Sequence, residues 1–370
     1  MSYKIPKFVP CMGTEGKISL LGLTLTELQD AVIKAGMPKF TASQIADWIY
    51  AKRVCSIDDM TNISKKGRES LSALYTVGRV QAQRTQKSKD GTIKYLFSVG
   101  DGRFVESVYI PEKDRATLCI SSQAGCQMGC EFCATGRQGF KGNLTAGQIL
   151  NQVLSIEDAE TLTNIAYMGM GEPLNNLTEV LKSMEILTAP YGYAWSPKRI
   201  TLSTVGILPA LKTFIESCSC NLAVSLHIPY PDVRAAYMPA EKAYPIDDVL
   251  KLIRQYDWSG QRRVSFEYTM FKGVNDSPAD AARLAKMVHG IQCHVNLIPF
   301  HKIPESKLEP AAPATMQNFM KELERYKIPT TIRRSRGQDI EAACGMLSQL
   351  NYAASESRSE TCFNYAERSK

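Results

Sequence analysis

The chain has 370 residues, of which 44% are hydrophobic and 22% are charged, and it carries a formal net charge of +7. This composition is typical of a globular protein, and no apolar run reaches the length of a membrane span. Residues 1–17 lack the apolar core of a signal peptide. Eleven cysteines in a chain without such a signal indicate metal or redox chemistry instead of a disulfide framework, and predict a reducing, cytoplasmic location.

The positive charge is concentrated in the first third of the chain. Residues 1–110 contain 16 Lys and Arg against 10 Asp and Glu, and the remainder is almost neutral. A basic module beside a neutral body suggests an RNA-docking element beside a catalytic body. The same charge fits a merely solvated surface equally well. The tightest basic cluster is formed by Lys65, Lys66 and Arg68.

The first 111 residues divide into two patterns. Apolar residues at helical spacing predict helices, the first capped by Thr24 or Thr26 and ended by Gly36 and Pro38. Asp-Gly pairs between short alternating runs then predict hairpins. We therefore expect a helical RNA-docking module over 1–78, with helices over 23–36, 40–52 and 65–75. A β-meander linker is expected over 79–111, with turns at 90–91 and 101–102.

From residue 112 strand and helix patterns alternate. The six candidate strands are ATLCIS, NIAYMGM, RITLSTV, NLAVSLH, RVSFEYTM and CHVNLIPF, and helical stretches such as TAGQILNQVLSIE and ADAARLAKMVH lie between them. Six such units predict an α/β fold, a partial (βα)6 barrel of parallel strands with its chemistry at the carboxyl ends of the strands. The core is expected over 112–350, followed by a polar tail over 351–370.

The most informative motif is a loop with three cysteines, GCQMGCEFCATG, which contains Cys126, Cys130 and Cys133. An iron–sulfur cluster normally takes four thiolates. Three thiolates leave one iron of a [4Fe–4S] cluster free to bind the amino and carboxylate groups of S-adenosylmethionine (SAM). One electron from the cluster then cleaves SAM to a 5′-deoxyadenosyl radical, so this spacing predicts radical SAM chemistry.

A structural zinc site is the alternative for these cysteines. Such sites are usually closed by a fourth ligand, commonly from a second Cys or His pair, and no such pair lies near the loop in sequence. The pair Cys218 and Cys220 has a single intervening residue, which is tight for chelating zinc. Phe132 is the aromatic residue that often precedes the last cysteine in radical SAM loops, so the cluster is favoured over zinc.

Several polar segments at expected strand ends are candidates for binding SAM. The segment GMGEP contains Gly171 and Glu172, and its glycines allow the backbone to approach a ligand closely. Taken singly, each candidate is also compatible with a core polar residue or an ordinary turn. The remaining candidates are Ser203, Ser225, Leu226, His227 and Asn296.

Six segments in one order carry a resemblance to a known family. They are LCISSQAGCQMGCEFCATGRQGF, MGMGEPLNN, ITLSTVGILPAL, VSLHIPY, VNLIPF and IEAACGML. Together they closely resemble the RlmN/Cfr family of radical SAM RNA methyltransferases, from about residue 21 to residue 350. The resemblance implies methylation of an adenosine in the peptidyl-transferase centre of 23S rRNA, at carbon 2 for RlmN-type and carbon 8 for Cfr-type enzymes. Some RlmN-type enzymes also methylate the adenosine beside the anticodon in certain tRNAs.

The resemblance also implies a mechanism with two SAM molecules per turnover. Cys344 is expected to accept a methyl group from the first SAM and to lose a hydrogen to the radical made from the second. The resulting carbon radical adds to adenine, Glu106 removes the ring proton, and Cys119 releases the product by forming a transient disulfide with Cys344. An electron donor such as flavodoxin or ferredoxin and a monomeric enzyme without a membrane partner are expected.

Within the family, most motif details favour carbon 2. MGMGEPLNN, NLIPF and RRSRGQDIEAACG are RlmN-like, whereas SLHIPY is closer to the Cfr-type SLHSPY, and YMPAEKAYP departs from the form common in both. The alternatives are a Cfr-type carbon 8 enzyme that confers antibiotic resistance, a radical SAM enzyme that does not methylate, and an RNA-binding protein with a structural cluster.

Overall fold

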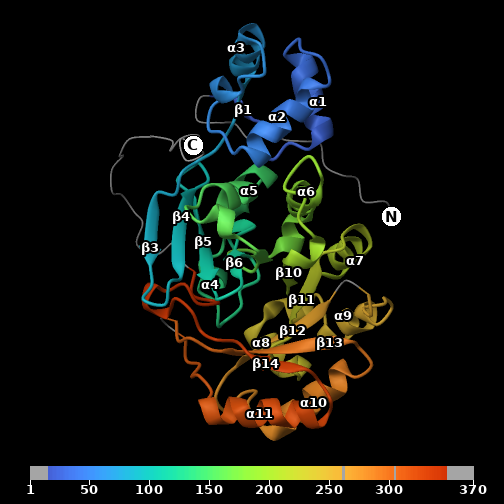
Figure 1. The fold of residues 1–370 in the computed structure, drawn as a ribbon. Helices are drawn as coiled ribbons and strands as arrows, with labels where there is room; N and C mark the ends of the chain where they lie inside the picture. The colour runs from blue at the N-terminus through green and yellow to red at the C-terminus, as the bar shows by residue number, and fades with distance from the viewer. Residues whose placement is uncertain (1–15, 261–262, 304–305, 348–370) are drawn as a thin grey trace.

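The computed structural model describes residues 16–260, 263–303 and 306–347 (Figure 1). The expected tail over 351–370, together with Cys11 and Cys362, lies outside the described residues. No helix within the described ranges is long and apolar enough to cross a membrane.

The N-terminal module is a small group of helices at one end of the molecule (Figure 1). Thr24 caps the first helix, as one of the two predicted caps, and Glu27 completes a capping box with it. The two chain ends of the module are joined by a parallel pair of two-residue strands. Its elements are β1 (Ile18–Ser19), α1 (Leu25–Lys34), α2 (Thr41–Ala46) continued by a π-helical turn (Asp47–Ala51), α3 (Lys65–Leu74) and β2 (Tyr75–Thr76).

The three hairpin strands predicted after this module are present. Asp90-Gly91 and Asp101-Gly102 form the turns between them, with Asp101 and both glycines at positive φ. The strands are β3 (Arg84–Lys87), β4 (Ile93–Ser98) and β5 (Phe104–Pro111), and they are antiparallel. They are hydrogen-bonded directly into the main sheet through β5 and β6, so meander and core share one sheet.

The main sheet has ten strands in the order β14-β13-β12-β11-β10-β9-β6-β5-β4-β3. All six predicted core strands are present and run parallel, and a seventh parallel strand, β14, extends the row. Sequence analysis missed β14 because it has only three residues. The core strands are β6 (Ala116–Cys119), β9 (Asn164–Tyr167), β10 (Ile200–Thr204), β11 (Asn221–Ser225), β12 (Val264–Met270), β13 (Cys293–Pro299) and β14 (Thr330–Ile332).

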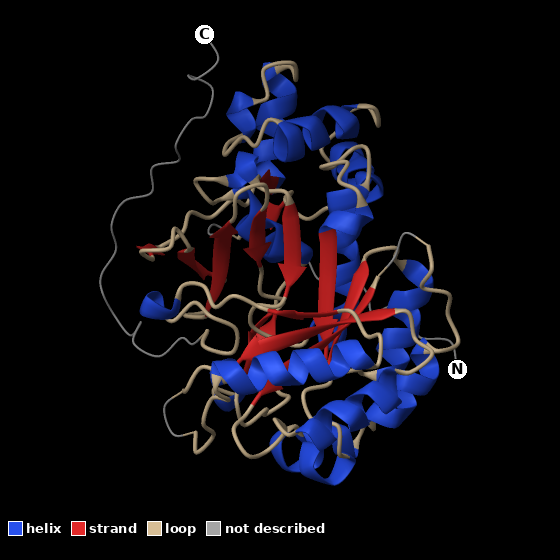
Figure 2. Cartoon of the chain, turned by 60° about the horizontal axis from the view of Figure 1, so that its bottom comes forward, coloured by secondary structure: helices blue, strands red, loops and turns tan. Residues whose placement is uncertain are grey.

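Helices connect the parallel strands and gather along the outer side of the curved sheet, as Figure 2 shows. Right-handed crossovers of this kind leave the carboxyl ends of all seven strands at one edge. The helices are α5 (Ala146–Leu154), α6 (Leu177–Thr188), α7 (Leu208–Ser217), α8 (Pro231–Tyr237), α9 (Ile246–Ile253), α10 (Pro278–Val288) and α11 (Pro313–Arg325). The cluster loop adds α4 (Ala134–Arg137) and the small hairpin β7 (Gln123–Gly125) with β8 (Phe140–Asn143).

The basic cluster predicted on α3 divides into two kinds of side chain. Lys65 and Lys66 are exposed. Arg68 instead donates to the backbone carbonyl of Ile63 at 2.7 Å and to that of Met60 at 3.4 Å, so its guanidinium supports the turn before the helix. Of the three residues of the basic cluster, only the two lysines therefore remain candidates for RNA contacts.

We expect the double change Lys65→Ala and Lys66→Ala to weaken RNA binding and to reduce its dependence on salt. Each lost phosphate contact lowers the slope of log affinity against log salt concentration by about 0.7–0.9, so the two changes together should lower it by roughly 1.5. Binding titrations at several salt concentrations measure this slope. The control is the double change Lys286→Ala and Lys321→Ala, which removes two exposed lysines from α10 and α11. A slope unchanged by the first pair would show that the α3 face is only solvated.

Candidate active site

The three-cysteine loop follows β6 and β7 at the carboxyl edge of the sheet. Glycines shape it: Gly125 is at φ +71°, and a Cβ there would lie 1.9 Å from the carbonyl oxygen of Gly139. Cys126 and Cys130 are buried, and burial raises the pKa of Cys126 to about 12. Burial and the neighbouring Cys133 thiol raise the pKa of Cys130 as well. The loop therefore gathers three shielded thiols that influence one another.

The loop supplies the number of thiols that a [4Fe–4S] cluster with one open iron takes. Cys126, Cys130 and Cys133 lie within eight consecutive residues, and binding of the cluster would deprotonate their thiols. The residues present therefore fit three cysteine ligands of such a cluster.

The C-terminal segment docks on this loop and brings Cys344 to it. The backbone N–H of Ala134 donates to the carbonyl of Gly345 at 2.8 Å, and the Thr135 hydroxyl donates to the carbonyl of Leu347 at 2.8 Å. Gly345 is at φ +81°, and a Cβ there would lie 3.2 Å from the carbonyl oxygen of Phe132. These contacts hold Cys344 beside the cluster loop, although the two segments are separated by more than 200 residues in sequence.

Cys119 lies at the end of β6, and its thiol shares one electrostatic environment with Cys344. Burial raises the pKa of Cys119 to about 12; the Cys344 thiol raises it further, and the Arg333 guanidinium opposes this. Cys119 and Cys344 are both in the thiol form. The Cys344 thiol also raises the pKa of Cys133, although burial is the larger cause. The structure therefore brings Cys119, Cys133 and Cys344 together.

Glu106 lies on β5, and its side chain is fully buried. The carboxylate forms an ion pair with Lys94, whose Nζ lies 3.1 Å from Oε1. The same Nζ lies 3.5 Å from the backbone carbonyl of Glu341, three residues before Cys344. Lys94 thus links Glu106 to the C-terminal segment that carries Cys344.

The GMGEP segment packs tightly against the strand before the cluster loop. A Cβ on Gly169 would lie 2.7 Å from the backbone of Ile120, and one on Gly171, at φ +98°, would lie 2.5 Å from the Gln123 side chain. Each oxygen of the Glu172 carboxylate accepts one backbone N–H, from Leu174 and from Val205. A carboxylate can accept further hydrogen bonds, so these two contacts hold Glu172 in place and leave it able to accept from a ligand.

The predicted Ser225 is the last residue of β11, and Leu226 and His227 follow it in a sharply turned backbone, with His227 at φ 56°. The fully buried Arg234 fixes this turn by donating to the carbonyls of Ser225 at 2.9 Å and Leu226 at 3.0 Å. Burial lowers the pKa of His227 to about 3. Its Nδ1 accepts from the backbone N–H of Thr269, so the imidazole is neutral with Nε2 carrying the proton.

Phe132 of the cluster loop packs edge-on against His227, with the ring centroids 5.0 Å apart. Ser203 lies on the neighbouring strand β10. A cavity of about 560 Å³ opens along the concave side of the sheet, and both Cys344 and Asn296 line it. Four arginines and two carboxylates are among its lining residues: Arg115, Arg333, Arg334, Arg336, Glu112 and Glu267. His294 and His301 also line it, and burial lowers the pKa of both imidazoles.

Proteins of high similarity share nearly the whole chain. A probable dual-specificity RNA methyltransferase RlmN from Parabacteroides distasonis is 56% identical over 90% of this chain and 97% of its own length. The chain belongs to the RlmN family. Two further relatives support this assignment. The probable dual-specificity RNA methyltransferase RlmN of Porphyromonas gingivalis is 54% identical over 94% of this chain and 98% of its own length. The dual-specificity RNA methyltransferase RlmN of Syntrophus aciditrophicus is 39% identical over 90% of this chain and 97% of its own length.

Family models and a solved structure support the RlmN assignment. Residues 18–77 match the ribosomal RNA large subunit methyltransferase N-terminal domain, and residues 120–285 match the radical SAM superfamily. The crystal structure of a radical SAM methyltransferase from Sphaerobacter thermophilus has a TM-score of 0.84 and 40% identity, covering 89% of this chain and 98% of that one. The predicted fold, the enzyme class and the use of a [4Fe–4S] cluster with SAM are thereby confirmed, and the alternatives without methyl transfer are excluded.

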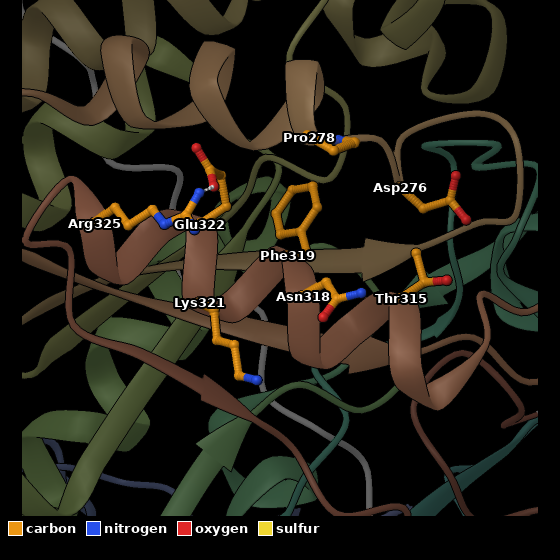
Figure 3. A pocket seen from close by; sticks show the side chains of 8 residues that line it. All are labelled: Asp276, Pro278, Thr315, Asn318, Phe319, Lys321, Glu322 and Arg325. Carbon is orange, nitrogen blue, oxygen red and sulfur yellow. Dashed lines mark hydrogen bonds and ion pairs between the residues drawn. The ribbon is translucent and has the colours of Figure 1, made fainter.

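A second, smaller pocket of about 280 Å³ lies between α10 and α11, away from the RlmN-type site (Figure 3). Two of its charged side chains, Glu322 and Arg325, are paired by a 2.6 Å contact. None of the predicted site residues lines this pocket.

Sequence reasoning missed three residues that shape the RlmN-type site. Arg333 follows β14 and acts electrostatically on both Cys119 and Cys344. Arg234 holds the backbone after β11, and Glu267 on β12 lines the cavity. In the sequence, each of these residues stands out only as a charged residue at or near an apolar segment. Charged residues are most often exposed to solvent, so this signal did not point to the site.

Proposed function

We propose that this enzyme methylates carbon 2 of an adenosine in the peptidyl-transferase centre of 23S rRNA and of the adenosine beside the anticodon in some tRNAs, through an S-methylcysteine on Cys344. The observation that carries the proposal is the position of Cys344, which lines the cavity and lies beside both Cys119 and Cys133. The relatives are dual-specificity RNA methyltransferases, and the N-terminal match is to a large-subunit ribosomal RNA methyltransferase domain, so both support RNA as the substrate class.

The arrangement suits a methyl group that reaches the base by way of sulfur. Carbon 2 of adenine is electron-poor and cannot attack the SAM methyl group directly. The Cys344 thiolate can attack it. Arg333 is its neighbour, since the Cys344 thiol is the largest cause of the raised pKa of Arg333. When bound, the cluster supplies the electron that cleaves a second SAM and so removes a hydrogen from the S-methyl group.

Three residues then complete the transfer. The S-methylene radical of Cys344 adds to carbon 2 and forms a carbon–carbon bond. Glu106, paired with Lys94, takes the proton from carbon 2, and one electron leaves the adduct, for which the oxidised cluster would be the acceptor. Cys119 then gives up its thiol proton, and its sulfur bonds to the Cys344 sulfur as the sulfur–methylene bond breaks. The methylene carbon takes up one proton to become the methyl group, and the disulfide between Cys119 and Cys344 remains.

The four arginines that line the cavity support RNA as the substrate. Their side chains can contact phosphates on either side of an adenosine whose base enters the cavity. The N-terminal module would add phosphate contacts away from the reacting base. A flavodoxin or ferredoxin as electron donor, a cytoplasmic location and a monomeric state remain part of this proposal.

The product itself tests the position of methylation. We expect nucleosides from an in vitro reaction with a 23S rRNA fragment to contain 2-methyladenosine, and the same product with tRNA. Chromatography against standards of both isomers measures this outcome. A dominant 8-methyladenosine would overturn the carbon 2 assignment in favour of Cfr-type chemistry, which uses the same methylated cysteine.

A further inference from the structure

Glu267 is a buried carboxylate in the wall of the cavity. It lies on β12, only 3% of its surface is exposed, and it lines the same cavity as Cys344. Its Oε1 accepts two hydrogen bonds, from Asn296 Nδ2 at 2.8 Å and from the Ser265 hydroxyl at 3.0 Å. Its Oε2 is buried and has no hydrogen-bond partner within the part of the chain that the structure describes. One carboxylate oxygen is thus satisfied by protein and the other is not.

An unsatisfied buried carboxylate oxygen is costly, because the group gave up its bonds to water on folding. Burial raises the pKa of Glu267, and the Asn296 amide, the Arg333 guanidinium and the Ser265 hydroxyl oppose that rise. A donor that arrives with a ligand would remove the cost. Since an ionised carboxylate only accepts hydrogen bonds, the ligand group must be a donor, such as a hydroxyl.

The register of the sheet identifies which ligand comes to this position. Glu267 is paired with Ser225 on β11 and with Asn296 on β13, so the three residues form one row across adjacent strands. Its backbone carbonyl also accepts from the N–H groups of Leu226 and His227. Glu267 therefore lies in the middle of the set of residues expected to bind SAM.

We propose that the free Oε2 of Glu267 accepts hydrogen bonds from the ribose hydroxyls of SAM. An acidic side chain that binds a ribose diol is the device used in dinucleotide-binding sites. Glu267 also positions Asn296, whose amide oxygen accepts from the Thr331 hydroxyl at 2.8 Å while its nitrogen donates to Oε1. The inference rests on the use of SAM by this enzyme, but not on the S-methylcysteine route or on the position that is methylated.

Ligand analogues test the contact directly. S-adenosylhomocysteine keeps the ribose without undergoing cleavage, and analogues lacking the 2′- or the 3′-hydroxyl remove one donor each. We expect the anaerobic, cluster-loaded wild-type enzyme to lose at least about tenfold in affinity for one of these analogues, in line with a hydrogen bond to a charged group. Glu267→Gln should bind S-adenosylhomocysteine about tenfold more weakly and should discriminate little between it and that analogue.

Glu322→Gln is the matched control, because it changes a carboxylate that lines the other pocket. It should bind all three ligands like the wild type. Wild-type enzyme that is indifferent to both missing hydroxyls would overturn the proposal, and this result does not depend on any variant folding. Glu267→Gln could instead bind S-adenosylhomocysteine normally and RNA more weakly. That result would assign Oε2 to a ribose of the RNA and would also overturn the proposal.

Failure of this inference can be distinguished from failure of the proposed function. Binding of S-adenosylhomocysteine requires no methyl transfer, so it is unaffected if Cys344 is not the methyl carrier. Conversely, a ribose contact that fails the analogue test would say nothing against Cys344 as the methyl carrier, which transfer of a deuterated methyl group tests separately.

Discussion

Cys119→Ala should accumulate a covalent adduct between the protein and its RNA substrate. Cys119 is the thiol that shares its environment with Cys344. Without it, nothing attacks the Cys344 sulfur after the methylene carbon has bonded to adenine, so the RNA stays attached. Denaturing gel electrophoresis should show an RNA-bearing band that survives heat and detergent, and product release should stop after the first encounter.

Two further variants make this result specific. Cys344→Ala should give neither adduct nor methylated RNA, because the methyl carrier is absent. Cys293→Ala changes a cysteine on β13 whose thiol pKa burial raises to about 12, and it should turn over like the wild type. Normal turnover by Cys119→Ala or by Cys344→Ala would refute the two-cysteine route.

Replacement of Cys126, Cys130 or Cys133 with Ala should abolish both the iron content and the cleavage of SAM. Each thiolate ligates a different iron, so two remaining ligands cannot hold a [4Fe–4S] cluster firmly. Iron and sulfide analysis with the visible absorption of anaerobically purified protein measures the loading, and 5′-deoxyadenosine measures cleavage. Full iron content in any one of these variants would show that the ligands are misassigned.

The same variants separate cluster loss from misfolding. Circular dichroism should retain the α/β signal, because the main sheet and its core are built from apolar residues outside the loop. Cys293→Ala again serves as the control and should load iron normally. We expect RNA binding to be largely retained as well, since the arginines that line the cavity and the N-terminal module lie outside the cluster loop.

Local patterns explain which parts of the fold the sequence predicted. The capped first helix, the Asp-Gly turns and the six long apolar strands are determined by residues close together in the chain. The three-residue strand β14 was missed because its pairing with β13 is a tertiary contact. That the meander strands continue the main sheet depends likewise on the pairing of β5 with β6.

The site shows the same division. The cluster cysteines are recognisable because eight consecutive residues hold all three ligands. The roles of Cys344, Cys119 and Glu106 came only from a resemblance, because their proximity depends on a segment that docks from the far end of the chain. Glu267 was not predicted, since its significance lies in one unsatisfied oxygen and in its register with Asn296.

Methyl transfer from SAM that carries a trideuterated methyl group tests the central claim most directly. If the methyl group passes through Cys344, the radical removes one deuterium atom from it and becomes 5′-deoxyadenosine. The methyl carbon later takes up a proton in place of that deuterium. Mass spectrometry should then show 2-methyladenosine with two deuterium atoms and 5′-deoxyadenosine with one. Product that keeps all three deuterium atoms would mean direct transfer from SAM and would contradict the account.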